Sequence, residues 1–283
     1  MFLFVISVRS KGSLLYYKSI WDTVDSTLHS ILGQTDDRYH VAVVCEDNES
    51  KLYPSHDKIT YVHHNFLNDH KLGNNRLFNY YTAPESQLDL GCKNALALFK
   101  MKHLSPKYVF FLDAADFVHN KIVERALSAE TTESGWEIKL GMALRNFRYR
   151  SEFNMPQITG STHILNYAAI TRNFSFEKIE SSDLSINSFC NLLHPFYLRE
   201  VLGGSCNYEA FFHNKKFPVE QWPYAQSIVY NMGYTQLGSS KIPGMDSNHV
   251  WSPVLDEDGE LATSLIGYNI PDNYIHNPYV PSR

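Results

Sequence analysis

Apolar residues in the first half of the chain form short runs that alternate with segments of helical spacing. Four runs are predicted strands, and the first of them is apolar on both faces, which is typical of a parallel strand covered by helices on both sides. They span residues 2–8, 41–45, 59–62 and 108–112. Apolar residues recur at helical spacing between 20 and 32, before Gly33, and again from about 91 to 104. The alternation predicts a mostly parallel sheet built from strand–helix–strand units.

The second half of the chain has a different pattern. Residues 136–144 alternate apolar and polar positions, which is the period of a half-buried strand. This pattern predicts a mixed, partly antiparallel extension of the sheet. Further predicted elements are a strand over 163–170, helical segments near 192–202 and 208–215, and an extended segment over 227–232.

These elements predict a single α/β domain over residues 1–283, a Rossmann-type sandwich with helices on both faces of its central sheet. No internal repeat or linker divides it. We assign a ligand-binding half to 1–125 and a second half to 126–237. From Gly238 onward, Gly, Pro, Ser, Asn and Asp are frequent, which predicts a tail that wraps the surface or forms a lid.

Composition narrows the possible partners. The 283 residues carry a net charge of −5 and contain no basic run, so a nucleic-acid partner is not expected. The opening apolar stretch is too short to span a bilayer and lacks the features of a signal peptide, so we expect no transmembrane segment and a cytoplasmic protein, with peripheral association at the inner membrane left open. The four cysteines include no C-x-x-C pair and are expected to be buried free thiols.

Polar residues follow the predicted strands where each one ends. In open α/β sheets ligands bind beyond the carboxyl ends of the strands, and Arg9, Asp47 and Asp113 stand there. Neither a G-x-G-x-x-G sequence nor a P-loop is present, which disfavours a dinucleotide or P-loop site. A divalent cation, Mg²⁺ or Mn²⁺, held by strand-end carboxylates would provide another way to bind phosphates.

Three motifs carry a resemblance to a known family. They are S-I-L-G-Q-T at 30–35, G-C-K-N-A-L at 91–96 and L-D-A-A-D at 112–116. With the strand that ends at Asp47, they resemble the opening of the GT-A-fold glycosyltransferases of family two, over about the first 125 residues. Shorter pieces at 135–136, 160–162 and 222–224 are similar to a poorly characterised bacterial branch of these enzymes.

The resemblance implies a function and roles for matching residues. It implies an inverting glycosyltransferase that acts in polysaccharide biosynthesis. This enzyme would move a sugar from a nucleotide-diphosphate donor to a glycan or glycolipid acceptor, with residues 126–237 as its acceptor-side half. Asp47 would accept hydrogen bonds from the base of the donor, Lys93 would lie near its diphosphate, and Asp113 would contact ribose or metal. The alternatives are a turn or capping carboxylate for Asp47 and a solvated helix face for Lys93.

The chain departs from the family pattern at its D-x-D position. Residues two apart on an extended strand point to the same side, but the second carboxylate is replaced by Ala115. Asp116 can join Asp113 only if the chain turns at once after Asp113. We therefore consider a metal site of Asp113, Asp116 and a distant histidine, His249 or alternatively His213, beside a metal-independent site.

An inverting transfer also needs a general base for the acceptor hydroxyl. Glu209 is the predicted base, and Asp183 and Asp246 compete with it. Two other functions stay open. One is a catalytically silent nucleotide- or glycan-binding protein, which the Ala115 substitution suggests. The other is a sugar nucleotidyltransferase, for which R-S-K-G at 9–12 is a poor version of the expected Gly-rich loop.

Overall fold

A computed structural model gives the fold. It describes residues 1–8, 17–46, 55–66, 84–130, 133–145, 148–157, 159–204, 211–212, 218–225, 227–231, 252–253, 265 and 267–270. The main sheet has seven strands in the order β10-β6-β9-β4-β1-β2-β3. These strands are β1 (Phe2–Ser7), β2 (Tyr39–Glu46), β3 (Ile59–His64), β4 (Tyr108–Leu112), β6 (Gly135–Glu137), β9 (His163–Asn166) and β10 (Glu220–Gln221).

The first four strands are mutually parallel, as the sequence predicts. β1 pairs with β2 on one side and with β4 on the other, and β3 follows at the edge beyond β2. β9 is antiparallel to both β4 and β6, which makes the extension of the sheet mixed. The predicted class, an α/β fold with a mostly parallel central sheet, is confirmed.

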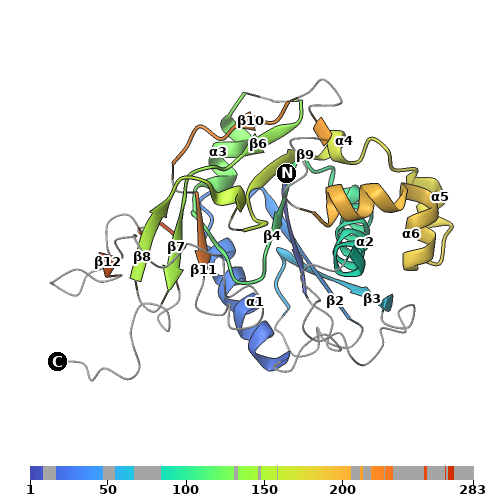
Figure 1. The fold of residues 1–283 in the computed structure, drawn as a ribbon, viewed down its shortest axis with the longest axis horizontal. Coiled ribbons are helices and arrows are strands. Elements are labelled where there is room, and N and C mark those ends of the chain that lie inside the picture. Colours follow the sequence, from blue (N-terminus) through green and yellow to red (C-terminus); the bar gives the residue numbers. More distant parts are fainter. Residues whose placement is uncertain are drawn as a thin grey trace.

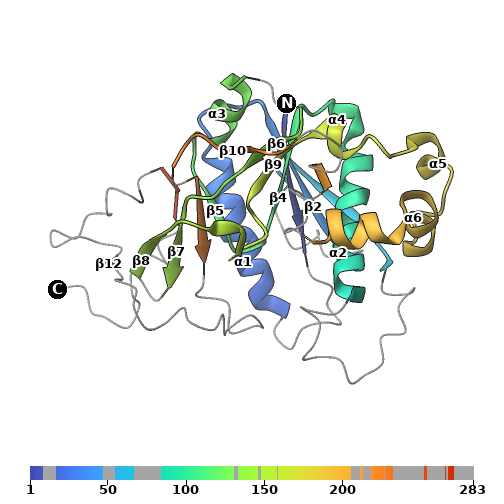
Figure 2. The same cartoon turned by 45° about the horizontal axis from the view of Figure 1, so that its top comes forward.

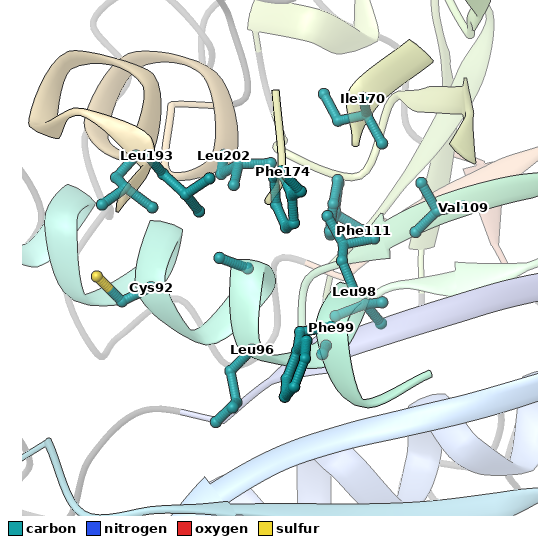
Figure 3. Packing of buried hydrophobic residues seen from close by; sticks show 14 of the residues in the cluster. Cys92, Leu96, Leu98, Phe99, Val109, Phe111, Ile170, Phe174, Leu193 and Leu202 are labelled. Carbon is teal, nitrogen blue, oxygen red and sulfur yellow. The ribbon is translucent and has the colours of Figure 1, made fainter. Parts of the chain in front are cut away.

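Alternate residues of β1 belong to different cores. Phe4 and Ile6 pack with α1 (Tyr17–Leu32) and α3 (Ile122–Ser128), whereas Leu3 and Val5 pack with α2 (Pro84–Lys100). Figures 1 and 2 show α1 and α2 on opposite sides of the sheet. The face of α2 carries further helical segments, and Figure 3 shows the packing beneath them. These segments are α4 (Tyr167–Ile170), α5 (Phe176–Glu180), α6 (Ile186–Leu193) and a π-helix, η6 (Tyr197–Leu202).

A second sheet lies on the side of α1 (Figure 2). Its five strands have the order β12-β8-β7-β11-β5. They are β5 (Phe117–Val118), β7 (Gly141–Arg145), β8 (Arg148–Glu152), β11 (Ile228–Asn231) and β12 (Ser252–Pro253). Leu265 and Tyr268, from the predicted tail, are buried against this sheet in a core of their own. Short 3-10 turns, η4 (Lys102–Leu104) and η5 (Met155–Gln157), complete the described elements.

Two strand predictions in the second half are wrong. The segment 136–144 is not one strand, because β6 ends at Glu137 and β7 begins at Gly141 in the other sheet. Trp136 packs in the core beside α1, while Met142 packs in the core of the second sheet. The alternating pattern over 136–144 is therefore divided between strands of two different sheets. The strand predicted over 163–170 stops at Asn166, whose side chain accepts a hydrogen bond from Ala169 N and caps α4.

The predicted helices are present with shifted ends. α2 begins at Pro84, earlier than predicted, and its first residue is one that suits the first turn of a helix. Helical structure near 192–202 is divided between α6 and η6. Most of the helix predicted over 208–215 lies outside the described residues, and the division of the chain into halves and tail stays a prediction.

Candidate functional site

The chain turns sharply where β4 ends. Asp113 follows the last residue of the strand, and its carbonyl oxygen accepts hydrogen bonds from Ala115 N at 2.8 Å and Asp116 N at 3.1 Å. The extended geometry that would place residues 113 and 115 on one side is therefore absent. The turn is the condition under which Asp116 can approach Asp113. Asp113 is exposed and Asp116 is fully buried.

A single hydroxyl lies between the two carboxylates. Thr159 Oγ1 donates to Asp116 Oδ2 at 2.6 Å and lies 3.2 Å from Asp113 Oδ2. A hydroxyl carries one proton, and the shorter distance places that proton in the hydrogen bond to Asp116. The same hydroxyl accepts a hydrogen bond from Ser161 N at 3.2 Å. Thr159 thus joins the turn after β4 to the segment that leads into β9.

The neighbours of Thr159 complete the support of Asp113. Gly160 N donates to Asp113 Oδ2 at 3.1 Å, and Asp113 N donates to Ser161 Oγ at 2.7 Å. The Asp113 carboxylate is thus held by a backbone donor, while the residue remains exposed to solvent. Sequence reasoning assigned no role to Thr159. The run T-G-S-T before a predicted strand was the available signal, because such small polar residues are typical of backbone-binding turns.

Lys93 lies at the end of β1. Its Nζ is 2.7 Å from Asp89 Oδ2, one helical turn earlier, and donates to the Val8 carbonyl at 3.1 Å. The side chain is almost completely buried, so the alternative of a solvated helix face is wrong. Burial of an ammonium requires such a paired carboxylate. The Lys93 ammonium, which α2 carries, therefore lies at the carboxyl end of β1, and Asp113 lies at the carboxyl end of the adjacent strand β4.

Polar and close backbone contacts fix the position of α2. Asn94 accepts a hydrogen bond from Ser7 Oγ and donates to the Leu202 carbonyl, both at 2.7 Å. One turn away, a Cβ on Gly91 would lie 1.9 Å from the Leu198 carbonyl oxygen. The helix and η6 therefore approach each other at a distance that only glycine allows.

His64, at the end of β3, is a buried histidine that sequence reasoning did not select. Its Nδ1 accepts a hydrogen bond from Phe66 N at 3.2 Å, and its ring stacks on Phe66 with centroids 4.6 Å apart. Burial, and then the positive charge of Lys93, lowers the pKa of His64 to about 3. The ring is neutral near pH 7, and the bond at Nδ1 assigns its proton to Nε2.

A second buried histidine lies beside the segment that supports Asp113. His163 Nε2 is 3.7 Å from Glu137 Oε1 across the β6–β9 pair, and Lys139 Nζ is 3.1 Å from the other oxygen of Glu137. Burial, and then the charge of Lys139, lowers the pKa of His163 to about 3. Glu137 is thus a carboxylate at the carboxyl end of β6 that sequence reasoning also missed.

Several predicted site residues cannot be placed. Arg9, Asp47, Glu209 and His249 lie outside the described residues, as do His213 and Asp246. Among the described residues, no group of three or more His, Cys, Asp and Glu side chains is placed to hold a metal ion. The described helices include none long and apolar enough to cross a membrane.

Asp183, one of the competing bases, lies just before α6, whose N-cap is Ser185. Its Oδ1 accepts hydrogen bonds from Ser188 Oγ and from Ser185 N. These bonds, that of the Ser188 hydroxyl first, lower the pKa of Asp183 to about 2. A carboxylate with so low a pKa is a weak proton acceptor near pH 7. The structure therefore favours a structural role for Asp183, which holds Ser185 and Ser188 at the start of α6.

Comparisons with known proteins give loose structural likenesses. No protein-family model matches the chain, and no curated protein sequence matches it. S. aureus TarS in complex with UDP is 10% identical with a TM-score of 0.41, over 82% of this chain and 60% of the TarS chain. Mouse xyloside xylosyltransferase 1 is 12% identical with a TM-score of 0.43, over 86% of this chain and 100% of the other. An active-site mutant of LgtC is 10% identical with a TM-score of 0.38, over 82% of this chain and 88% of the other. Likenesses at this level carry no argument about function, which rests on the site itself.

Proposed function

We propose that the protein is a glycosyltransferase that binds a nucleotide-diphosphate sugar at the carboxyl ends of β1 and β4. The order of the parallel strands supports this location. From β1 the chain adds β2 and β3 on one side and then crosses through α2 to place β4 on the other side of β1. Such a reversal leaves a crevice at the carboxyl ends of the two central strands, which is where open α/β sheets bind ligands.

The fixed, exposed carboxylate of Asp113 is the observation that carries the proposal. A carboxylate at this edge accepts hydrogen bonds from ribose hydroxyls or binds a cation, as the family resemblance implies for Asp113. Hydrogen bonds from Gly160 N to its carboxylate and from its own N to Ser161 Oγ hold Asp113 in place, which reduces the conformational entropy lost when it binds. Without this support, an exposed aspartate would be an ordinary surface residue.

A diphosphate can bind beside the Asp113 carboxylate only if positive charge compensates for the negative charge of the diphosphate. The Lys93 ammonium provides positive charge at the end of β1, but Asp89 already pairs with it. Asp113 and Asp116 are hard oxygen donors close to one hydroxyl, which fits a magnesium or manganese ion in donor type. We propose Asp113, Asp116 and His249 as its ligands, and the bound ion would neutralise the diphosphate of the donor.

The transfer itself needs a base on the acceptor side. In the proposed inverting reaction, the acceptor oxygen bonds to the anomeric carbon as the bond to the diphosphate oxygen breaks, and the base takes the hydroxyl proton. Glu209 remains the proposed base. Asp113 orients the donor and Lys93 contributes positive charge near the leaving diphosphate.

A thermal-shift screen tests the binding step. Nucleoside diphosphates are added with and without Mn²⁺ to the wild type, to Asp113→Asn and to Asp57→Asn. Asp57 is an exposed aspartate that lies before the amino end of β3, away from the carboxyl ends of the strands, so it is a matched control. A ligand that binds the folded state raises the melting temperature. We expect a shift in the wild type and in Asp57→Asn that Asp113→Asn loses.

Hydrolysis of the donor sugar separates this function from its main alternative. A catalytically silent binding protein would show the same nucleotide-dependent shift but release no sugar from any nucleotide-sugar donor. The glycosyltransferase proposal expects slow donor hydrolysis by the wild type. Glu209→Gln would retain the thermal shift and lose the hydrolysis, because the proposed base takes a proton from the attacking hydroxyl or water and has no proposed role in donor binding.

A further inference from the structure

The motif S-I-L-G-Q-T at 30–35, where α1 ends, has no role in the proposed reaction. Its glutamine reaches a segment far along the chain. Gln34 Nε2 donates to the His119 carbonyl oxygen at 3.0 Å, and Gln34 Oε1 accepts a hydrogen bond from Val123 N at 3.2 Å. One side chain therefore ties the end of α1 both to the residue after β5 and to the first turn of α3.

Two other residues of the motif bind the same segment. Val118 N, in β5, donates to Oγ of the fully buried Ser30 at 3.3 Å. Thr35 N donates to the Asn120 carbonyl oxygen at 2.8 Å. The motif thus contacts the backbone at 118, 119, 120 and 123, and it fixes the course of the chain from β5 into α3.

The contact with Val123 N meets a need that arises from the way α3 begins. Amides in the first turn of a helix have no acceptor within the helix, and Lys121, the N-cap residue of α3, makes no side-chain hydrogen bond to them. Val123 is fully buried, so its amide needs an acceptor other than bulk water. Gln34 provides that acceptor from the end of another helix, as a capping side chain does locally in other helices.

The segment that the motif holds begins directly after Asp116. Phe117 and Val118 form β5, and Figure 2 shows β5 beside α1. Asp116 stands between this strand and the turn in which its own N donates to the Asp113 carbonyl oxygen. A displacement of β5 along α1 would therefore move the buried Asp116 carboxylate away from Thr159 Oγ1, which lies 2.6 Å from it.

We propose that Gln34 is a positioning residue for Asp116. By holding residues 118–123 against the end of α1, its two hydrogen bonds keep the Asp116 carboxylate beside Thr159 and Asp113, where it would bind the divalent cation of the donor complex. The role in binding rests on the proposed function, in which Asp116 is a ligand of that cation. Gln34 acts through β5 and does not itself touch the substrate.

Hydrogen exchange in the ligand-free protein tests the link between Gln34 and the turn. Gln34→Met keeps the length of the side chain and removes both hydrogen bonds. We expect amide exchange in peptides that cover 113–118 to be about 2- to 30-fold faster in this variant, because the amides of Ala115 and Asp116 open more often when β5 is released. Faster exchange confined to 119–124, with exchange at 113–118 unchanged, would overturn the proposal.

Thr171→Val is the control for a loss of stability elsewhere in the protein. Thr171 is buried, and its Oγ1 donates to the Tyr167 carbonyl oxygen at 2.7 Å. This bond closes the end of α4, which packs in the core beside α2. The valine variant also loses a hydrogen bond, but it leaves α1 and β5 intact. We expect it to lower the melting temperature and to leave exchange at 113–118 as in the wild type.

Calorimetric titration of UDP in the presence of Mn²⁺ tests the consequence for binding, at a temperature where every variant is fully folded. We expect Gln34→Met to bind UDP about 2- to 30-fold more weakly than the wild type, and Thr171→Val to bind it equally well. Gln34→Glu keeps an acceptor for Val123 N, but its carboxylate cannot donate to the His119 carbonyl oxygen. It should therefore show a loss similar to that of Gln34→Met.

The outcomes separate the positioning role from the proposed function. Wild-type affinity in both Gln34 variants, or an equal loss in Thr171→Val, would overturn the positioning role. A wild type that does not bind UDP would overturn the proposed function and with it the role of Gln34 in binding. The exchange experiment would then still decide whether Gln34 holds the turn at Asp116.

Discussion

Replacing Thr159 with valine removes the hydroxyl between Asp113 and Asp116 with almost no change in side-chain volume. The hydroxyl donates to Asp116 at 2.6 Å in a fully buried position and accepts from Ser161 N at 3.2 Å. A hydrogen bond to a charged group contributes about 1.5–3 kcal/mol, and the amide of Ser161 also loses its acceptor. Since valine leaves no cavity, we expect the free energy of unfolding to fall by about 2–3 kcal/mol.

Thr159→Ser is the matched control for this prediction. Serine keeps the hydroxyl and loses one methyl group, which costs about 1 kcal/mol at a buried site. Unfolding in urea, followed by circular dichroism, gives both differences from the shift of the transition midpoint. The valine variant should be clearly the less stable of the two. If valine is as stable as the wild type, or if serine costs as much as valine, the Thr159 hydroxyl does not stabilise the buried Asp116 carboxylate.

Three further predictions follow from the close contacts and charges. Gly91→Ala should lower the free energy of unfolding by about 1–3 kcal/mol, because the alanine Cβ would collide with the Leu198 carbonyl oxygen. An unchanged melting temperature would contradict this close approach of α2 and η6. Burial lowers the pKa of His64 and of His163 to about 3, so only the unfolded chain gains protons at these sites as the pH falls from about 6.5. The free energy of unfolding should be highest above that pH and should fall, as the pH is lowered further, by about 1.4 kcal/mol per pH unit for each histidine. His64→Gln should remove one of these two contributions when unfolding in urea is measured at several pH values. Ala115→Asp should not strengthen nucleotide binding in calorimetry with Mn²⁺, because the turn after Asp113 removes the extended geometry that would place residues 113 and 115 on one side; stronger binding that appears only with the metal would contradict this turn.

The sequence predicts β1, β2 and β4 well because 2–6, 41–45 and 108–112 are continuous apolar runs, and such runs occur where both faces of a sheet are covered. β3, at the edge of the sheet, contains Thr60 and is only partly buried. The sequence predicts the second half poorly for a physical reason. The alternation over 136–144 is the same whether the strand continues or passes into another sheet, and only packing distinguishes the two. The cap at Asn166 is a local signal that the sequence does carry, but an apolar segment after it obscured the end of the strand.

The candidate site was predictable only in part. Asp113 was found because a carboxylate follows directly after a buried strand. Thr159 was not, because it meets Asp113 across a separation of 46 residues, and no local pattern reports such a contact. The partner of Lys93 was available from the sequence, since Asp89 stands four residues earlier on the same helix face. Its burial was not, because that depends on the neighbouring segments.

The binding of a nucleoside diphosphate at Asp113 is the central claim, and calorimetric titration tests it most directly. UDP is titrated in the presence of Mn²⁺ into the wild type, Asp113→Asn and the control Asp57→Asn. We expect equal affinity for the wild type and the control, and an affinity about 10-fold weaker for Asp113→Asn, which corresponds to the loss of one charge-assisted contact. Equal affinity of all three proteins for UDP would contradict the placement of the donor at the carboxyl ends of β1 and β4.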